Sequence, residues 1–105
     1  MTCSRNDVVL LPVPFTDLTS LKVRPAVVLG KATRHHDLFI VPISSQLPNT
    51  DYALLDWQAA GLNVACGIKA QLATVEERLV VKRLGQLSAG NQQAMDRLFR
   101  GWLGL

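Results

Sequence analysis

The apolar residues of this 105-residue chain form short runs over most of its length and a helical pattern only at its end. The runs are rich in β-branched residues and are separated by Gly, Pro, Asn, Asp and Ser, which is typical of strands joined by turns. The runs at 25–29 and 38–43 are apolar on both faces, which predicts central strands, whereas Pro12 and Pro14 confine the first run to an end or edge of the sheet. We expect strands at residues 7–14, 25–29, 38–43, 51–56, 65–70 and 78–84.

One connection between these runs is long, and the period changes near the end of the chain. Residues 15–23 (FTDLTSLKV) exceed what a tight hairpin needs, and long loops often carry function. From Ser88, the expected N-cap, a helical spacing links Met95, Leu98, Phe99 and Trp102. The pattern predicts one domain over residues 1–105, a small, mostly antiparallel sheet or open barrel with an amphipathic C-terminal helix.

Composition adds constraints on partners. Apolar residues make up 49% of the chain and the mean hydropathy is +0.20, from which we expect a second copy to cover part of the surface in a homodimer. The net charge of +3 is compatible with a polyanionic partner. Cys3 and Cys66 are far apart and lack neighbours at metal-ligand spacing, so we expect free thiols, with neither a disulfide nor a zinc site.

The sequence also bears on location. No run reaches the roughly 20 apolar residues that a membrane helix requires. Asp7 and two prolines interrupt the apolar start of the chain, and no small-residue cleavage site follows it, so a secretory signal is not expected. We therefore expect a cytoplasmic protein without membrane contact.

The two central runs place an arginine and a serine in register. Partners in an antiparallel hairpin have a nearly constant sum of residue numbers, and a turn centred on Arg34 gives a sum of about 68. Arg24, at the start of one strand, then lies opposite Ser44, at the end of the other, with both side chains on one face. We expect a guanidinium and a hydroxyl to meet at this end of the sheet, beside the long connection.

Such a pair suits a phosphate group. A guanidinium can hold two phosphate oxygens and stabilise the added charge of a pentacovalent transition state, and a hydroxyl supplies a further donor. RNA carries its own nucleophile, the 2′-OH, so cleavage to a cyclic phosphate requires positioning and charge stabilisation but no metal and no cofactor. Arg24 is a poor base, so the proton acceptor stays open. On residue type alone, an Arg before Pro at a strand end is more often a surface salt-bridge partner.

Several segments of the chain resemble the MazF/PemK toxin family. The most specific are the sequence RPAVVL and the P-x-[ST]-x-Q pattern that follows it. The matching segments are 7–10 (DVVL), 14–17 (PFTD), 22–29 (KVRPAVVL) and 41–46 (VPISSQ), with weaker matches at 61–62, 68–72 and 83–88. The resemblance therefore extends over nearly the whole chain.

This resemblance implies an SH3-like barrel with a C-terminal helix. It implies a homodimer that cleaves single-stranded mRNA at short sequences and is neutralised by a cognate antitoxin. Catalysis is assigned to Arg24 and to Ser44, which occupies a position where the family usually has Thr. Ser keeps the hydroxyl but lacks the methyl group that restricts the rotamer, so we expect activity with looser positioning. The implied RNA-binding residues are Phe15, Thr16, Asp17, Lys22, Gln46, Lys69 and Gln71, the first three from the loop beside the active site.

Two positions depart from the family pattern. Ala70 stands where the family commonly has an acidic residue, which removes any polar contact of that side chain. Asn6 replaces a Gly at the entry to the first strand. We expect little effect there, because Asn tolerates the turn conformations that Gly favours.

Other residues invite functional interpretations that we consider weaker. His35 and His36 could be a general acid and base, but they lie at the far end of the hairpin, roughly 25 Å from Arg24 at about 3.3 Å per residue. We expect an exposed turn there.

The remaining candidates are expected to be structural. Asp51 and Asp56 are isolated acids and not an expected carboxylate pair. Phe99 and Trp102 have the spacing of core residues rather than of base-stacking platforms.

Two other functions stay open. CcdB-like toxins share this type of barrel, poison DNA gyrase without enzymatic activity and depend on a C-terminal Trp-Gly-Ile, which residues 101–105 (GWLGL) echo loosely. A degenerate member that binds RNA or an antitoxin without cutting is the other possibility, suggested by Ser44 and Ala70.

Overall fold

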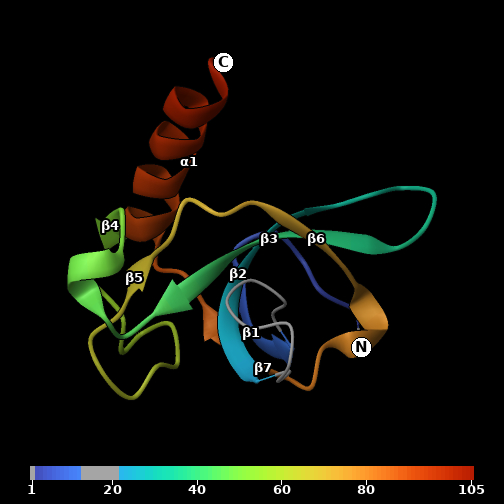
Figure 1. Ribbon diagram of the computed structural model, residues 1–105, viewed down its shortest axis with the longest axis horizontal. Helices are drawn as coiled ribbons and strands as arrows, with labels where there is room; N and C mark the ends of the chain where they lie inside the picture. The colour runs from blue at the N-terminus through green and yellow to red at the C-terminus, as the bar shows by residue number, and fades with distance from the viewer. Residues whose placement is uncertain (1, 13–21) are drawn as a thin grey trace.

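The chain forms an antiparallel sheet and one long helix in the computed structural model, which describes residues 2–12 and 22–105 (Figure 1). The strands are β1 (Asp7–Pro12), β2 (Val23–Lys31), β3 (Asp37–Ser44), β4 (Tyr52–Ala53), β5 (Gly67–Ile68), β6 (Ala73–Glu76) and β7 (Lys82–Gln86). Two 3₁₀ helices, η1 (Leu47–Asn49) and η2 (Glu77–Leu79), precede the helix α1 (Ala89–Leu103). This confirms the predicted class of a mainly antiparallel β fold with a C-terminal helix.

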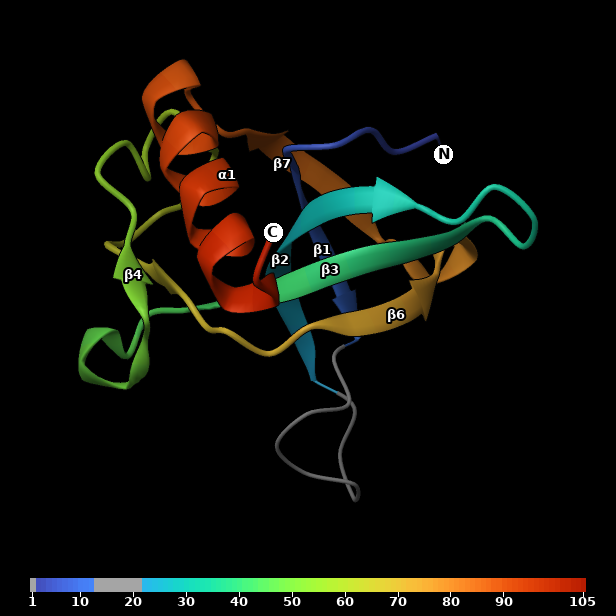
Figure 2. The same ribbon diagram turned by 90° about the horizontal axis from the view of Figure 1, so that it is seen from above.

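The sheet has the order β4-β5-β3-β2-β1-β7, and β6 also pairs with β3. The outer edge of β3 is shared, because β6 pairs with its first half and β5 with its last two residues. The hairpin turn between β2 and β3 and the pair β4–β5 consequently lie at opposite ends of the molecule (Figures 1 and 2).

The two central strands predicted from the sequence are confirmed, and both extend beyond their apolar runs because polar end residues still pair. β1 is an interior strand rather than an edge strand, since it pairs with both β2 and β7. Pro12 is accommodated there as the last residue of β1, a position that tolerates a residue without a backbone N–H.

Other predicted strands are corrected. The run at 78–84 was expected to be one strand, but its first two residues belong to η2 and pairing begins only at Lys82. The chain needs this turn to pass from β6 to β7. The runs at 51–56 and 65–70 contain only the two-residue strands β4 and β5. β6 was not predicted, because only Val75 of its four residues is buried.

Two hydrophobic clusters lie on the two faces of the central strands. The inner core is Cys3, Val9, Leu11, Ala26, Val28, Leu38, Ile40 and Val75. The helix-side core joins α1 to the other face through Val8, Val27, Val41, Ile43, Ile68, Met95 and Phe99, among others. The rings of Phe99 and Trp102 meet edge to face at 5.4 Å, so both aromatic residues serve packing, as expected.

The ends of α1 and the entry to β1 follow their local sequence. The Ser88 Oγ accepts a hydrogen bond from the Asn91 N–H, which confirms the predicted N-cap, and Gly104 closes the helix with a φ of 71°. Asn6 has a φ of 73°, a left-handed conformation that Gly favours and that Asn adopts more readily than most other residues.

Within the described residues, no helix combines the length and apolarity needed to cross a membrane.

Candidate active site

The pairing of β2 with β3 ends at Ala26–Pro42, two residues before Arg24 on one strand and Ser44 on the other. The pairs Ala26–Pro42 and Val28–Ile40 follow the register expected from the sequence. Continued by two residues along both strands, this register sets Arg24 opposite Ser44. Leu11 of β1 pairs with Arg24 on its other side. The two residues therefore share one end of the sheet.

The face on which these residues lie follows from strand alternation. Ala26 and Val28 point into the inner core, and alternate residues of a strand share a face. Arg24 and Ser44 therefore lie on the inner-core face, away from α1. Arg24 is exposed and Ser44 is half-buried, so a ligand can reach both at the rim of the core.

The turn after β3 orients the Ser44 hydroxyl. Its Oγ accepts a hydrogen bond from the backbone N–H of Gln46 at 3.1 Å, which leaves the Ser44 O–H to donate. Gln46 is the residue before η1, and its Oε1 accepts from the side chain of Asn49 at 3.2 Å. Because Asn49 donates to the Gln46 Oε1, the amide N–H₂ of Gln46 remains a donor on an exposed side chain two residues after the serine.

Lys69 and Gln71 follow β5 along the outer edge of β3, between Ile68, which pairs with Ile43, and Ala73, which pairs with Ile40. Ser44 pairs with Gly67, and the N–H of Lys69 donates to the carbonyl of Pro42 at 3.0 Å, which continues the pairing past the strand. Lys69 therefore lies beside Pro42, two residues along β3 from Ser44 and on the same face. The N–H of Gln71 donates to the Lys69 carbonyl at 2.8 Å, and Gln71 is exposed.

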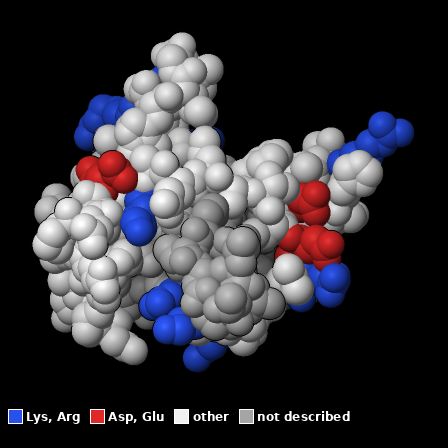
Figure 3. Space-filling view, in the orientation of Figure 1, with Lys and Arg blue, Asp and Glu red and all other residues white. Residues whose placement is uncertain are grey.

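The electrostatic surroundings of this end favour an anion. Among the described residues, no carboxylate lies within ion-pair distance of Lys22, Arg24 or Lys69. Figure 3 shows several basic groups near the lower middle of one face and others at its sides, where the visible acidic groups also lie. A phosphate group would meet uncompensated positive charge here.

Not every predicted residue joins this cluster. Phe15, Thr16 and Asp17 lie outside the described residues. His35 and His36 are exposed at the turn between β2 and β3, at the end of the hairpin opposite Arg24, as expected.

The two isolated acids have structural partners, as expected. Asp51 Oδ2 accepts from the backbone N–H of Ala70 at 2.7 Å, and Asp56 Oδ2 accepts from the Ser88 hydroxyl at 2.7 Å. Sequence reasoning missed that the first of these bonds lies beside the site, because the contact spans 19 residues and depends on the pairing of β4 with β5.

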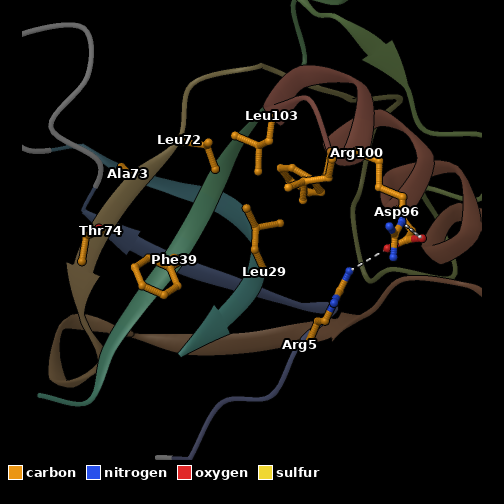
Figure 4. Close-up of a pocket in the computed structure, with 11 residues that line it drawn as sticks. Arg5, Leu29, Phe39, Leu72, Ala73, Thr74, Asp96, Arg100 and Leu103 are labelled. Atoms are coloured by element: carbon orange, nitrogen blue, oxygen red, sulfur yellow. Dashed lines mark hydrogen bonds and ion pairs between the residues drawn. The ribbon is translucent and has the colours of Figure 1, made fainter. Parts of the chain in front are cut away.

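A cavity of about 480 Å³ lies on the opposite side of the sheet, between α1 and the strands β2, β3 and β6 (Figure 4). Leu29, Phe39, Leu72 and Leu103 point into it, and Arg5 bonds Asp96 at its rim. None of the candidate catalytic or RNA-binding residues that the structure describes lines this cavity. In the part of the chain that is described, no cluster of three or more His, Cys, Asp or Glu could hold a metal ion.

Comparison with known proteins identifies the family. The model of the family described as the PemK-like, MazF-like toxin of type II toxin-antitoxin systems matches residues 4–103. A solved structure described as an endoribonuclease in complex with its cognate antitoxin, from a mycobacterial species, is similar in fold with a TM-score of 0.72 and 13% identity, over 98% of this chain and 94% of that chain. A search of curated proteins finds no match. The family match spans nearly the whole sequence, and the chain therefore belongs to the PemK-like, MazF-like toxins of type II toxin-antitoxin systems.

Proposed function

We propose that this toxin is an endoribonuclease that cuts single-stranded RNA without a metal. The 2′-OH attacks the adjacent phosphorus, the bond from phosphorus to the 5′-oxygen of the next nucleotide breaks, and the products carry a 2′,3′-cyclic phosphate and a 5′-OH. The observation that carries the proposal is the β2–β3 register, which leads from Ala26–Pro42 toward Arg24 and Ser44 at an exposed end of the sheet, with Lys69 beside Pro42. The similar fold of a protein described as an endoribonuclease supports it.

The roles follow from the chemistry of each side chain. Arg24 is protonated when the reaction begins and stabilises the charge that grows on the phosphate oxygens, and it can give a proton to the leaving oxygen and regain one from water. The Ser44 O–H donates to the same phosphate, because its Oγ already accepts from the Gln46 N–H. RNA binding is proposed for Phe15, Thr16, Asp17, Lys22, Gln46, Lys69 and Gln71.

The test is cleavage of a long single-stranded RNA in excess chelator, with product ends mapped. The wild type is expected to give discrete fragments with cyclic phosphate ends. Arg24→Ala should lower the rate by about a hundredfold or more, the usual loss when a transition-state donor is removed. Arg24→Lys keeps the charge but not the two-pronged donor and is expected to recover only part of the rate.

Intact RNA with folded protein would overturn the nuclease. Binding of RNA or antitoxin without cutting would then identify a non-cutting member, and gyrase poisoning would identify a CcdB-like toxin. No observation favours gyrase binding, since Trp102 of the C-terminal segment packs edge to face on Phe99.

The proposal includes two partners and a location. A cognate antitoxin would neutralise the toxin, and the site of action is the cytoplasm, where mRNA is found.

The toxin is expected to be a homodimer, and exposed apolar side chains around the α1 cavity support this: Phe39 is 42% exposed and Leu105 is 79% exposed. Sedimentation equilibrium would show a dimer mass at micromolar concentration, and a monomer at every concentration would contradict it.

A further inference from the structure

Each backbone N–H of residues 69–71, the segment after β5, has an acceptor, and two of the three acceptors lie outside the segment. The N–H of Lys69 donates to the carbonyl of Pro42, and that of Gln71 donates to the carbonyl of Lys69. The N–H between them, that of Ala70, donates to the Asp51 carboxylate at 2.7 Å. Asp51 supplies the one side chain among these three acceptors, so a point substitution can remove this anchor and leave the other two in place.

Asp51 is itself held rigidly. Its backbone N–H donates to the carbonyl of Ile68 at 2.8 Å, which continues the β4–β5 pairing. The preceding residue, Thr50, closes η1 by donating from both its N–H and its hydroxyl to the carbonyl of Leu47. The carboxylate is therefore presented from a fixed backbone between two candidate RNA-binding segments, since η1 begins after Gln46.

The same pairing keeps Asp51 from neutralising its neighbour. Continued by one residue, the β4–β5 register sets Asp51 opposite Lys69. Among the described residues, however, the Asp51 carboxylate forms no ion pair with the Lys69 ammonium, and its Oδ2 faces a backbone N–H instead. The charge of Lys69 remains available to a phosphate. Ala70 has no polar side-chain atom, so its N–H is the group through which this residue can be oriented.

We propose that Asp51 is a positioning residue of the RNA-binding end: its carboxylate fixes the backbone of residues 69–71 so that Lys69 and Gln71 face the substrate beside Ser44. This inference rests on the proposed ribonuclease function. Asp51 does not contact the reacting phosphate in this scheme. It lowers the cost of ordering two long side chains when RNA binds.

The test combines three variants with two measurements. Asp51→Ala removes the acceptor, Asp51→Asn keeps an acceptor oxygen without the charge, and Asp56→Ala is the matched control, because it removes a side-chain bond of equal length at the start of α1. Asp51→Ala is expected to raise KM for RNA about tenfold with kcat changed less than about threefold, and Asp51→Asn should restore most of the affinity. Asp56→Ala should leave KM unchanged.

A second background isolates the mechanism. In a protein that already carries Lys69→Ala and Gln71→Ala, Asp51→Ala should raise KM for RNA by less than about twofold, because the two side chains that Asp51 positions are gone. Equal effects in both backgrounds, equal effects of Asp51→Ala and Asp56→Ala, or a fall in kcat with KM unchanged would each overturn the positioning role.

A measurement independent of cleavage separates this inference from the proposed function. Hydrogen exchange of the Ala70 amide should be slow in the wild type and in Asp51→Asn and at least about tenfold faster in Asp51→Ala. RNA binding is measured in parallel by fluorescence anisotropy in an Arg24→Ala background. Normal cleavage with unchanged KM in Asp51→Ala defeats only the positioning role. Wild-type protein that neither cuts nor binds RNA defeats both proposals, whatever the exchange data show.

Discussion

Ser44 of β3 pairs with Gly67 of β5, and the space that a side chain at position 67 would need is filled by Thr50 and Tyr52. A Cβ at Gly67 would lie 2.4 Å from Thr50 Oγ1 and 2.9 Å from the Tyr52 carbonyl oxygen. Gly67→Ala is therefore expected to displace β4 from β5 and lower the free energy of unfolding by about 1–3 kcal/mol. Urea denaturation measures this change, and RNA cleavage should fall with it.

Gly90 is the control for this substitution. A Cβ there would have no atom within 4 Å, and the residue lies in α1. Gly90→Ala should leave stability unchanged or raise it by up to about 1 kcal/mol. A Gly67→Ala protein that unfolds at the wild-type urea midpoint would show that β4 does not depend on the close approach.

Substitutions at Ser44 separate the hydroxyl from the shape of the side chain. Ser44→Ala removes the donor and is expected to lower kcat about ten- to a hundredfold. Ser44→Thr keeps the hydroxyl and restricts its rotamer, so kcat should stay within about threefold of the wild type or exceed it. Single-turnover cleavage of a short RNA reports both values, and a Ser44→Thr protein as slow as Ser44→Ala would contradict the role of the hydroxyl.

The pair of Glu77 and Lys31 makes stability depend on pH. Glu77 Oε2 lies 2.8 Å from Lys31 Nζ and accepts from the Cys3 N–H at 2.9 Å, and these bonds, that to Lys31 first, lower the pKa of the Glu77 carboxyl. A carboxyl with a lowered folded pKa adds stability that is present above the ordinary Glu pKa of about 4.3 and is lost as pH falls through the folded pKa. Glu77→Gln should therefore cost about 1–2 kcal/mol at pH 7 and progressively less below about pH 4.3.

The neighbouring pair provides the control for this pH effect. Glu76 and Arg78 form an ion pair in which both side chains are more than half exposed. Glu76→Gln is expected to change stability by less than about 0.5 kcal/mol at any pH. Equal losses in Glu76→Gln and Glu77→Gln, measured by urea denaturation between pH 3 and pH 7, would refute the assignment.

The two thiols should be inert in the folded protein. Both Cys3 and Cys66 are buried, and burial raises the pKa of each thiol, so little thiolate is present at neutral pH. Native protein should take up no iodoacetamide within an hour at pH 7, and unfolded protein should take up two equivalents. Rapid labelling of the native protein at either residue would contradict the burial of that thiol.

Short-range patterns in the sequence predicted the parts of this molecule that depend on local chemistry. The apolar runs located β2 and β3, and the spacing from Ser88 located α1. Because paired residues of an antiparallel hairpin have a constant sum of residue numbers, the sequence alone predicted the pairs Ala26–Pro42 and Val28–Ile40. This register leads toward Arg24 and Ser44.

Contacts that depend on distant segments could not be predicted in this way. β6 exists because β3 offers it an edge, and its own sequence contains one buried residue. The bond from Ala70 to Asp51 requires β4 and β5 to be paired first, and two-residue strands leave almost no periodic signal. The pairing of β6 and the bond from Ala70 to Asp51 could therefore not be predicted from the pattern of any single segment.

The pairing of β2 with β3 shifts by one residue between Val28 and Gly30. On the turn side of this bulge the partners are Gly30–Phe39 and Lys31–Leu38, whereas on the other side they keep the register that leads to Arg24 and Ser44. We expect that a residue deleted from the turn can be taken up by closing the bulge, so that the change stops before the end of the hairpin that carries Arg24 and Ser44. The turn around His35 is exposed at the other end of the hairpin, so we expect it to accept an inserted tag or fluorophore while Arg24 and Ser44 stay in place.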